Sequence, residues 1–345
     1  MTIKACLILA LLAAVPALAQ VTTEAPPVIP GAKPVTIEHI KVHSPAIEGN
    51  LEGESADRDV FVALPPSYAS HPDKRYPVVY ALHGYWIGAE QWMKEIHVPQ
   101  TLEGAFAQGA AEMIVVFPDS KTRYDGSFYS SSATVGDFET FIARDLVSYI
   151  DGHYRTLATR ESRGLAGHSM GGYGATRIGI KHADQFGALY IMSPCCQTAR
   201  SLEPAAIEAL GQVKAPDDMA KLPPMMHGLM ASAAAWSPNP RNPPLYFDLP
   251  VKDGAVRPEI LAKWAANAPL DFLDQYIPSM RSYRAIAIDV GDQDMLKTDT
   301  AKLHEALDLY GIANSFEIYP GTHTSHVAYR IQDKAIPFFA KTLKF

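Results

Sequence analysis

Six short apolar segments, each closed by turn residues, constrain the fold of this chain more than any other feature. They are YPVVYALHG (76–84), MIVVFPDS (113–120), RGLAGHS (163–169), ALYIMSP (188–194), RAIAIDVG (284–291) and SFEIYPG (315–321). A continuous apolar run of this length is typical of a strand buried on both faces. Such strands, alternating with amphipathic helices, predict an α/β fold with a mostly parallel central sheet and helices on both of its faces.

The segments around these runs complete the predicted architecture. Residues 136–154 carry apolar side chains at intervals of three and four, which predicts a helix, and Asp137 is placed to cap its start. Residues 299–312 show the same helical spacing. Near the beginning, residues 35–42 and 58–68 alternate in the β manner and predict an antiparallel pair at the edge of the sheet.

One long segment interrupts the alternation of strands and helices. Between residues 194 and 284 the chain is rich in proline, methionine and alanine and contains no good strand. A structureless loop of that length is improbable inside a domain. We therefore predict one domain over residues 35–345 that carries a helical cap, inserted at about residues 198–280.

The first residues differ in kind from the rest of the chain. One lysine precedes an apolar run of 15 residues, Ala5–Ala19, which ends in Ala-Leu-Ala. This pattern predicts a secretory signal peptide over residues 1–19. An uncleaved anchor is the alternative, but a spanning helix needs roughly 20 apolar residues. We expect residues 20–34, proline-rich and polar, to form a flexible or extended lead-in. Export to a bacterial periplasm or beyond the cell is the resulting prediction.

Charge and cysteine content exclude several classes of function. The chain has a net charge of −7 and no cluster of Lys and Arg, so neither nucleic-acid binding nor a patch for anionic membranes is expected. Stable membrane insertion is not expected either, because the apolar run of 15 residues is too short. Outside the predicted signal peptide only Cys195 and Cys196 remain, which rules out a long-range disulfide framework. A vicinal disulfide and two buried thiols both stay open, and the thiols are favoured. The sequence carries no signal for an oligomeric state.

The stretch LAGHSMGGYG, residues 165–174, fits the pattern Gly-x-Ser-x-Gly around Ser169. It lies at the end of a predicted buried strand and directly before a segment with helical periodicity. A nucleophile elbow needs this strand–turn–helix context and small neighbours, because the serine adopts a strained backbone conformation between closely packed elements. Ser169 is therefore the candidate nucleophile.

A serine hydroxyl becomes reactive when a base takes its proton and a carboxylate orients that base. In hydrolases of this architecture the chain order is Ser, acid, His, each just past a strand end. GDQDML offers Asp294 and Asp292, and we favour Asp294, which can turn back toward the base. YPGTHTSH offers His323 and His326, and we favour His323, which follows the glycine turn directly. No third ligand accompanies the two histidines, so no metal is predicted.

The remaining requirement of such a site is a pair of backbone amides that stabilise an oxyanion. One is expected from Met170, directly after the nucleophile, and the other from Tyr85, after a His-Gly turn that ends the third strand. Side chains near the site are candidates for a substrate pocket: Trp86, Tyr129, His168, Trp236 and Phe247. The alternative, that most of these aromatic residues belong to the core under the cap, stays open.

The motifs GLAGHSMGGYGA, GDQDML and YPGTHTSH, with VALPPSY near the start, resemble an esterase family of α/β-hydrolases. That family includes esterase D (S-formylglutathione hydrolases), feruloyl esterases, enterochelin esterases and mycolyl transferases, and the resemblance covers roughly residues 35–345. It implies the α/β-hydrolase fold and the same roles for Ser169, Asp294, His323, Tyr85 and Met170. Many relatives carry a tryptophan shortly after the histidine, whereas this chain has Ala328 and Tyr329.

These observations together predict an exported serine carboxylic-ester hydrolase. It would act on a small-molecule ester through an acyl-enzyme intermediate and would need no cofactor. Three alternatives remain: an acyltransferase with the same triad, a thioesterase resembling S-formylglutathione hydrolase, and a non-catalytic binding protein on a hydrolase fold.

Overall fold

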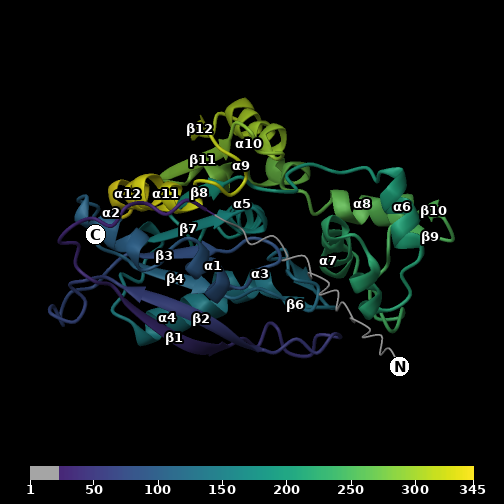
Figure 1. Ribbon diagram of the computed structural model, residues 1–345, viewed down its shortest axis with the longest axis horizontal. Coiled ribbons are helices and arrows are strands. Elements are labelled where there is room, and N and C mark those ends of the chain that lie inside the picture. Colours follow the sequence, from purple (N-terminus) through teal and green to yellow (C-terminus); the bar gives the residue numbers. More distant parts are fainter. Residues whose placement is uncertain (1–22) are drawn as a thin grey trace, which may run out of the picture.

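An eight-stranded sheet forms the centre of the molecule (Figure 1). The computed structural model describes residues 23–345, so the predicted signal peptide lies outside the described residues. All eight predicted strands are present: β1 (Thr36–His43), β2 (Asp57–Leu64), β3 (Val78–Leu82), β4 (Ile114–Pro118), β7 (Arg163–His168), β8 (Ala188–Met192), β11 (Ala285–Gly291) and β12 (Ser315–Tyr319).

The strands are arranged in the order β1-β2-β4-β3-β7-β8-β11-β12. β1 pairs antiparallel with β2, and β2 pairs antiparallel with β4. Every pair from β4 to β12 is parallel. The predicted mostly parallel sheet with an antiparallel edge is therefore confirmed. Because the parallel strands share one direction, their carboxyl ends meet at one edge of the sheet.

Successive residues of the central strands face opposite sides, and both sides are buried. On one side Val78, Tyr80 and Leu82 pack in a core cluster with residues of the helical segment that follows β4. Besides helices of the cap, the cluster includes buried residues of α3 (Phe138–Thr140), α4 (Leu146–His153), α5 (Met170–Lys181), α9 (Ile277–Arg281) and α10 (Lys297–Leu309). This alternation explains why the strands are apolar throughout.

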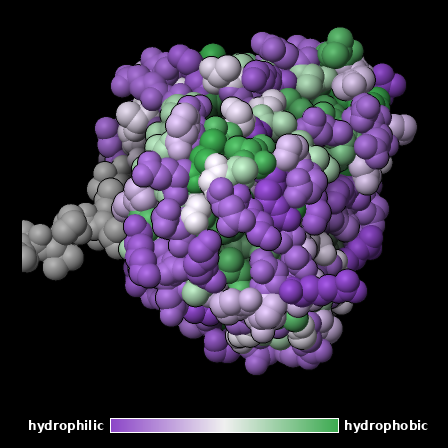
Figure 2. Space-filling view, turned by 90° about the vertical axis from the view of Figure 1, so that its right-hand side faces the viewer, coloured by the Kyte–Doolittle hydropathy of each residue, from purple (hydrophilic) through white to green (hydrophobic). Residues whose placement is uncertain are grey.

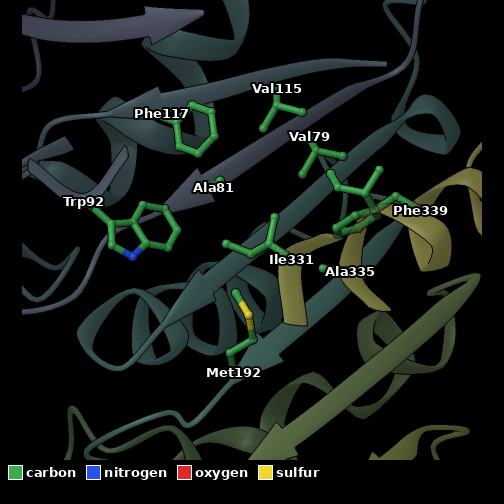
Figure 3. A pocket seen from close by; sticks show the side chains of 11 residues that line it. Val79, Ala81, Trp92, Val115, Phe117, Met192, Ile331, Ala335 and Phe339 are labelled. Carbon is green, nitrogen blue, oxygen red and sulfur yellow. The ribbon is translucent and has the colours of Figure 1, made fainter. Parts of the chain in front are cut away.

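The other side of the sheet is covered by helices from both ends of the domain, namely α1 (Ala89–Glu95), α2 (Gln100–Ala107), α11 (Val327–Arg330) and α12 (Ile336–Thr342). Figure 3 shows the side chains at this interface, where Val79 of β3, Phe117 of β4, Ile331 and Phe339 surround a space of about 20 Å³. A space this small and apolar belongs to the packing of the core rather than to a binding site.

The predicted helix over residues 136–154 is present with one irregularity. Its Asp137 carboxylate accepts a hydrogen bond from the Thr140 amide at 2.9 Å and caps the start, as expected. A π-helical turn, Phe141–Asp145, separates α3 from α4. The apolar stripe survives this turn, because Phe138, Phe141 and Ile150 are all fully buried.

The cap inserted between β8 and β11 contains α6 (Pro204–Gly211), α7 (His227–Trp236) and α8 (Pro258–Ala265). These elements stand beside the sheet in Figure 1. The expectation of a strand-free cap needs one correction, since β9 (Val251–Lys252) and β10 (Ala255–Val256) form a short hairpin. Figure 2 shows that the outer face on this side is mostly hydrophilic. No helix within residues 23–345 is long and apolar enough to cross a membrane.

Candidate active site

Ser169 occupies the turn between β7 and α5, with φ +60° and ψ −115°. A non-glycine residue in such a conformation costs about 1–3 kcal/mol and persists only where its surroundings fix it. Three hydrogen bonds do so here. The Ser169 amide donates to the Met192 carbonyl at 3.0 Å, and the Ser169 carbonyl accepts from the amides of Tyr173 and Cys195. The local geometry is that of a nucleophile elbow.

Glycines on both sides of Ser169 allow the close packing that this turn requires. A Cβ atom on Gly167 would overlap the backbone of Gly171, and one on Gly171 would overlap the carbonyl of Leu82. The Gly-x-Ser-x-Gly spacing thus follows from steric necessity, because strand β3 runs directly beside the elbow.

The structure brings Ser169, His323 and Asp294 together in one line of hydrogen bonds. The Ser169 hydroxyl lies 2.9 Å from Nε2 of His323, and Nδ1 of His323 lies 2.8 Å from the Asp294 carboxylate. The Asp294 side chain is fully shielded from solvent, and the His323 side chain is 25% exposed. The two residues lie just past the ends of β11 and β12, where strand order places them beside β7 and β8.

The environment of Asp294 favours its ionised form. Burial alone would raise its pKa, but the hydrogen bond and charge of His323 and the Leu296 amide lower it below the ordinary value. Since an ionised carboxylate only accepts, Nδ1 of His323 donates to it, which leaves Nε2 free to accept the hydroxyl proton of Ser169.

Asp292 and His326, the alternatives to Asp294 and His323 in the sequence, make other contacts. Asp292 accepts a hydrogen bond from the Gly321 amide at 2.9 Å and thereby holds the turn before His323. His326 precedes α11, where its ring lies 2.9 Å from the Ser325 hydroxyl. Neither residue contacts the Ser169 hydroxyl.

His168, predicted as a pocket residue, lines the cavity and also contacts the histidine loop. Its Nε2 lies 2.8 Å from the His323 carbonyl, which can only accept, so Nε2 carries the proton. Burial, together with a smaller effect of the neighbouring His323, lowers the pKa of His168 to about 3. His168 is thus a neutral donor that fixes the backbone of His323.

The loop after β3 brings Gly84 and Tyr85 to the elbow. A Cβ on Gly84 would lie 3.5 Å from the Cβ of Ser169. His83 is fully buried; its Nε2 accepts from the Ser120 amide at 2.8 Å and its Nδ1 donates to the Gly84 carbonyl at 2.8 Å. Because C=O and N–H of a trans peptide point in opposite directions, this contact turns the Tyr85 amide away from His83. Among the described residues, no acceptor bonds the amide of Tyr85 or of Met170.

Ser169 and His323 open into a cavity of about 440 Å³. This volume lies within the range of small-molecule sites, roughly 300–1,000 Å³. The predicted pocket residues Trp86 and His168 line it, together with Phe128 and Leu229.

Three predicted pocket residues, Tyr129, Trp236 and Phe247, do not line this cavity. They are buried in the core, which is the alternative that the sequence left open. The Tyr129 side chain is buried and donates to the His83 carbonyl at 2.9 Å. Phe247 is buried against Tyr124. Trp236 packs behind Phe128, at 4.8 Å between ring centroids, beside a smaller space of about 60 Å³.

Other wall residues were not predicted from the sequence. Cys195, Cys196 and Arg200 follow β8 and line the cavity. Met225 and Met295 also line it, and their exposed fractions are 71% and 76%. Both cysteines are free thiols, with 2.9 Å between their sulfur atoms. The position of Cys195, three residues past the end of β8, is the one signal that could have indicated it.

The described part of the chain contains no cluster of three or more His, Cys, Asp or Glu that could hold a metal ion. What the arrangement offers instead is a serine hydroxyl in contact with an imidazole that is oriented by a buried carboxylate. Such a group can take part in acyl transfer.

The sheet order and the elbow between β7 and α5 define the class of this protein as an α/β-hydrolase. The chain belongs to the esterase family described as "Putative esterase", whose sequence pattern matches residues 54–336.

Individual relatives share parts of the sequence or the whole fold. An esterase of Mycobacterium tuberculosis is 32% identical over 131 residues, which are 37% of this chain and 27% of the relative. An endo-1,4-β-xylanase/feruloyl esterase of Xylanibacter ruminicola is 27% identical over 121 residues, 35% of this chain and 17% of the relative. The match thus spans about a quarter or less of these relatives' length.

Solved structures match over nearly their full length. A ferulic acid esterase has a TM-score of 0.63 and 24% identity, over 90% of this chain and 99% of that structure. An S-formylglutathione hydrolase of Staphylococcus aureus has a TM-score of 0.58 and 17% identity, over 89% and 99%. At these identities the likeness establishes the α/β-hydrolase fold.

Proposed function

We propose that this protein is an exported serine hydrolase of small-molecule carboxylic esters. The observation that carries the proposal is the line of hydrogen bonds from Ser169 through His323 to Asp294, which opens into the cavity. Membership in an esterase family supports the reaction type. Export is supported by the signal-like pattern of residues 1–19.

The reaction begins with attack of the Ser169 oxygen on the ester carbonyl carbon. Nε2 of His323 takes the hydroxyl proton, and the resulting imidazolium is stabilised by Asp294. The carbonyl oxygen gains negative charge and accepts hydrogen bonds from the amides of Tyr85 and Met170. A single donor of this kind contributes a factor of about 10²–10³ to the rate.

The tetrahedral intermediate collapses when its C–O bond to the alcohol breaks. His323 gives its proton to the departing oxygen and leaves the acyl group on Ser169. Water then enters, loses a proton to His323 and attacks the acyl carbon. The acid departs and the Ser169 hydroxyl is restored. No cofactor takes part in this scheme.

The test is hydrolysis of p-nitrophenyl esters, from acetate to decanoate and including ferulate, by the mature protein and by Ser169→Ala. We expect the substitution to lower kcat by roughly 10⁴-fold or more. Ser70→Ala, a change in an exposed hydroxyl in the turns before β3, is the matched control and should retain wild-type turnover. Equal rates for wild type and Ser169→Ala would refute the nucleophile assignment.

Two further measurements separate the alternatives. Labelling of wild type but not Ser169→Ala by a fluorophosphonate, without ester hydrolysis, would indicate an acyltransferase or a different ester class. The mass of the protein recovered from the periplasm tests export, because cleavage after Ala19 leaves Gln20 as the first residue.

A further inference from the structure

The segment Thr23–Pro26, here called the N-terminal strap, lies against the loop that carries His323. The Thr23 hydroxyl donates to the Ser325 carbonyl at 3.3 Å and accepts from the Ala328 amide at 3.2 Å. The Glu24 amide donates to the same Ser325 carbonyl at 2.8 Å. The strap therefore bridges the histidine loop and the first turn of α11.

The other end of the strap is held by α2. The Gln100 side-chain amide donates to the carbonyl of Pro26, whose ring is buried. Glu24 adds a weaker contact, with its carboxylate 3.5 Å from Nε2 of His326 at an exposed position. Both ends of this short segment are thus tied to the domain, although the predicted lead-in has no regular secondary structure here.

A chain of contacts leads from the strap to the backbone next to His323. Thr23 holds the Ser325 carbonyl, and the Ser325 hydroxyl accepts from the Thr322 amide at 3.0 Å. Thr322 directly precedes His323. The hydroxyl of Thr23 donates to the loop and accepts from the first turn of α11, so its one proton is engaged within the protein.

Thr23 also lines the cavity that contains Ser169, on the side of Thr324 and Val327. Thr324 directly follows His323 in the chain, and Val327 is four residues after it. Since His323 gives its proton to the departing oxygen, the alcohol part of an ester must lie on the His323 side of Ser169. The strap precedes residue 54, where the match to the esterase family begins.

We propose that the N-terminal strap positions the His323 loop and forms one wall of the subsite for the alcohol part of the ester. Thr23 is the positioning residue. The inference rests on the proposed function and adds a region to the site that lies outside the family match.

The position of His323 affects two kinds of ester differently. An aliphatic alcohol leaves only with a proton from His323, whereas p-nitrophenolate leaves readily as an anion. Loosening of the histidine loop should therefore slow the acylation of alkyl esters more than that of nitrophenyl esters with the same acyl group.

The experiment compares kcat/KM for ethyl butyrate and p-nitrophenyl butyrate in wild type, Thr23→Val and Thr23→Ser. Valine keeps the shape of threonine but loses both hydrogen bonds, while serine keeps the hydroxyl. We expect Thr23→Val to lower kcat/KM for the ethyl ester about ten-fold and for the nitrophenyl ester less than about three-fold. Thr23→Ser should restore the ethyl ester to near the wild-type value.

Thr159→Val is the matched control, because its hydroxyl bonds only Ser162 and it precedes the opposite, amino end of β7. Equal loss on both esters in Thr23→Val, or no loss on either, would overturn the inference while leaving the proposed function intact. Absence of hydrolysis in the wild type would instead overturn the proposed function.

Discussion

Replacing Gly171 by alanine places a methyl group where the structure has no room for one. The new Cβ would overlap the Leu82 carbonyl and come within 2.8 Å of the His83 carbonyl oxygen, whereas real Cβ atoms stay beyond 3.0 Å. Both carbonyls belong to the end of β3 and the turn after it. The helix α5 and this strand must therefore move apart at the position where the loop reaches Ser169.

The energetic effect combines two opposing contributions. Insertion of a methyl group into packed structure costs about 1–3 kcal/mol, and the upper end applies here because the neighbours are backbone atoms. Alanine gains about 1 kcal/mol over glycine inside a helix. The free energy of unfolding should thus fall by about 2 kcal/mol. Movement of His83 and Gly84 also displaces the Tyr85 amide, so kcat should fall by about 10²–10³-fold.

The assay is thermal unfolding followed by circular dichroism, together with kcat on p-nitrophenyl butyrate. At about 1.5 °C per kcal/mol for a domain of this size, Gly171→Ala should lower Tm by about 3 °C. Gly152→Ala is the matched control, because a Cβ at this position of α4 has nothing within 4 Å. It should raise Tm by about 1–2 °C and leave kcat unchanged.

One result would refute the reasoning. If Gly171→Ala melts within about 1 °C of the wild type and keeps its kcat, the elbow is not closed by contact between α5 and the end of β3. The motif would then have no steric basis in this chain.

Two further predictions concern buried carboxylates. Burial would raise the pKa of Glu139, but the His182 hydrogen bond and the charges of Arg177 and Lys181 hold it at about 2, below its ordinary value of 4.5. This stabilisation is present above pH 4.5 and is lost as the pH falls toward 2. Urea unfolding should show Glu139→Gln losing about 3–5 kcal/mol at pH 7, because the buried Arg177 loses its partner, and less at low pH; a pH-independent loss would contradict this. Asp294→Asn should keep the fold but lower kcat on p-nitrophenyl butyrate roughly 10³–10⁴-fold, and unchanged turnover would exclude its role.

The sequence predicts the sheet well, because the central strands are buried on both faces and are therefore continuous apolar runs. The run 315–321 is the exception, since its strand β12 lies at the edge of the sheet and all of its residues but Tyr319 are partly or fully exposed. The sequence also predicts the elements that bring Ser169, Asp294 and His323 together, since each follows a strand that ends at the same edge. It favours Asp294 over Asp292 as well, and the structure adds the reason that the Asp292 carboxylate accepts a hydrogen bond from the Gly321 amide.

The walls of the cavity could not be predicted in the same way. An aromatic residue such as Phe247 looks the same in a sequence whether it lines a pocket or fills the core, and only the packing of the cap decides. The strap is a second example. Proline-rich polar segments have no periodicity, so nothing in residues 23–26 indicates that they dock beside His323.

The buried, neutral state of His168 limits which of the two histidines at the site can carry a positive charge. Because its pKa is lowered to about 3, this ring is neutral near pH 7. Its neighbour His323, at 4.7 Å between ring centroids, has a buried carboxylate on its far nitrogen and His168 does not. Of these two adjacent imidazoles, only His323 contacts both the Ser169 hydroxyl and a carboxylate. A proton that leaves Ser169 is therefore held by His323 and does not pass on to His168.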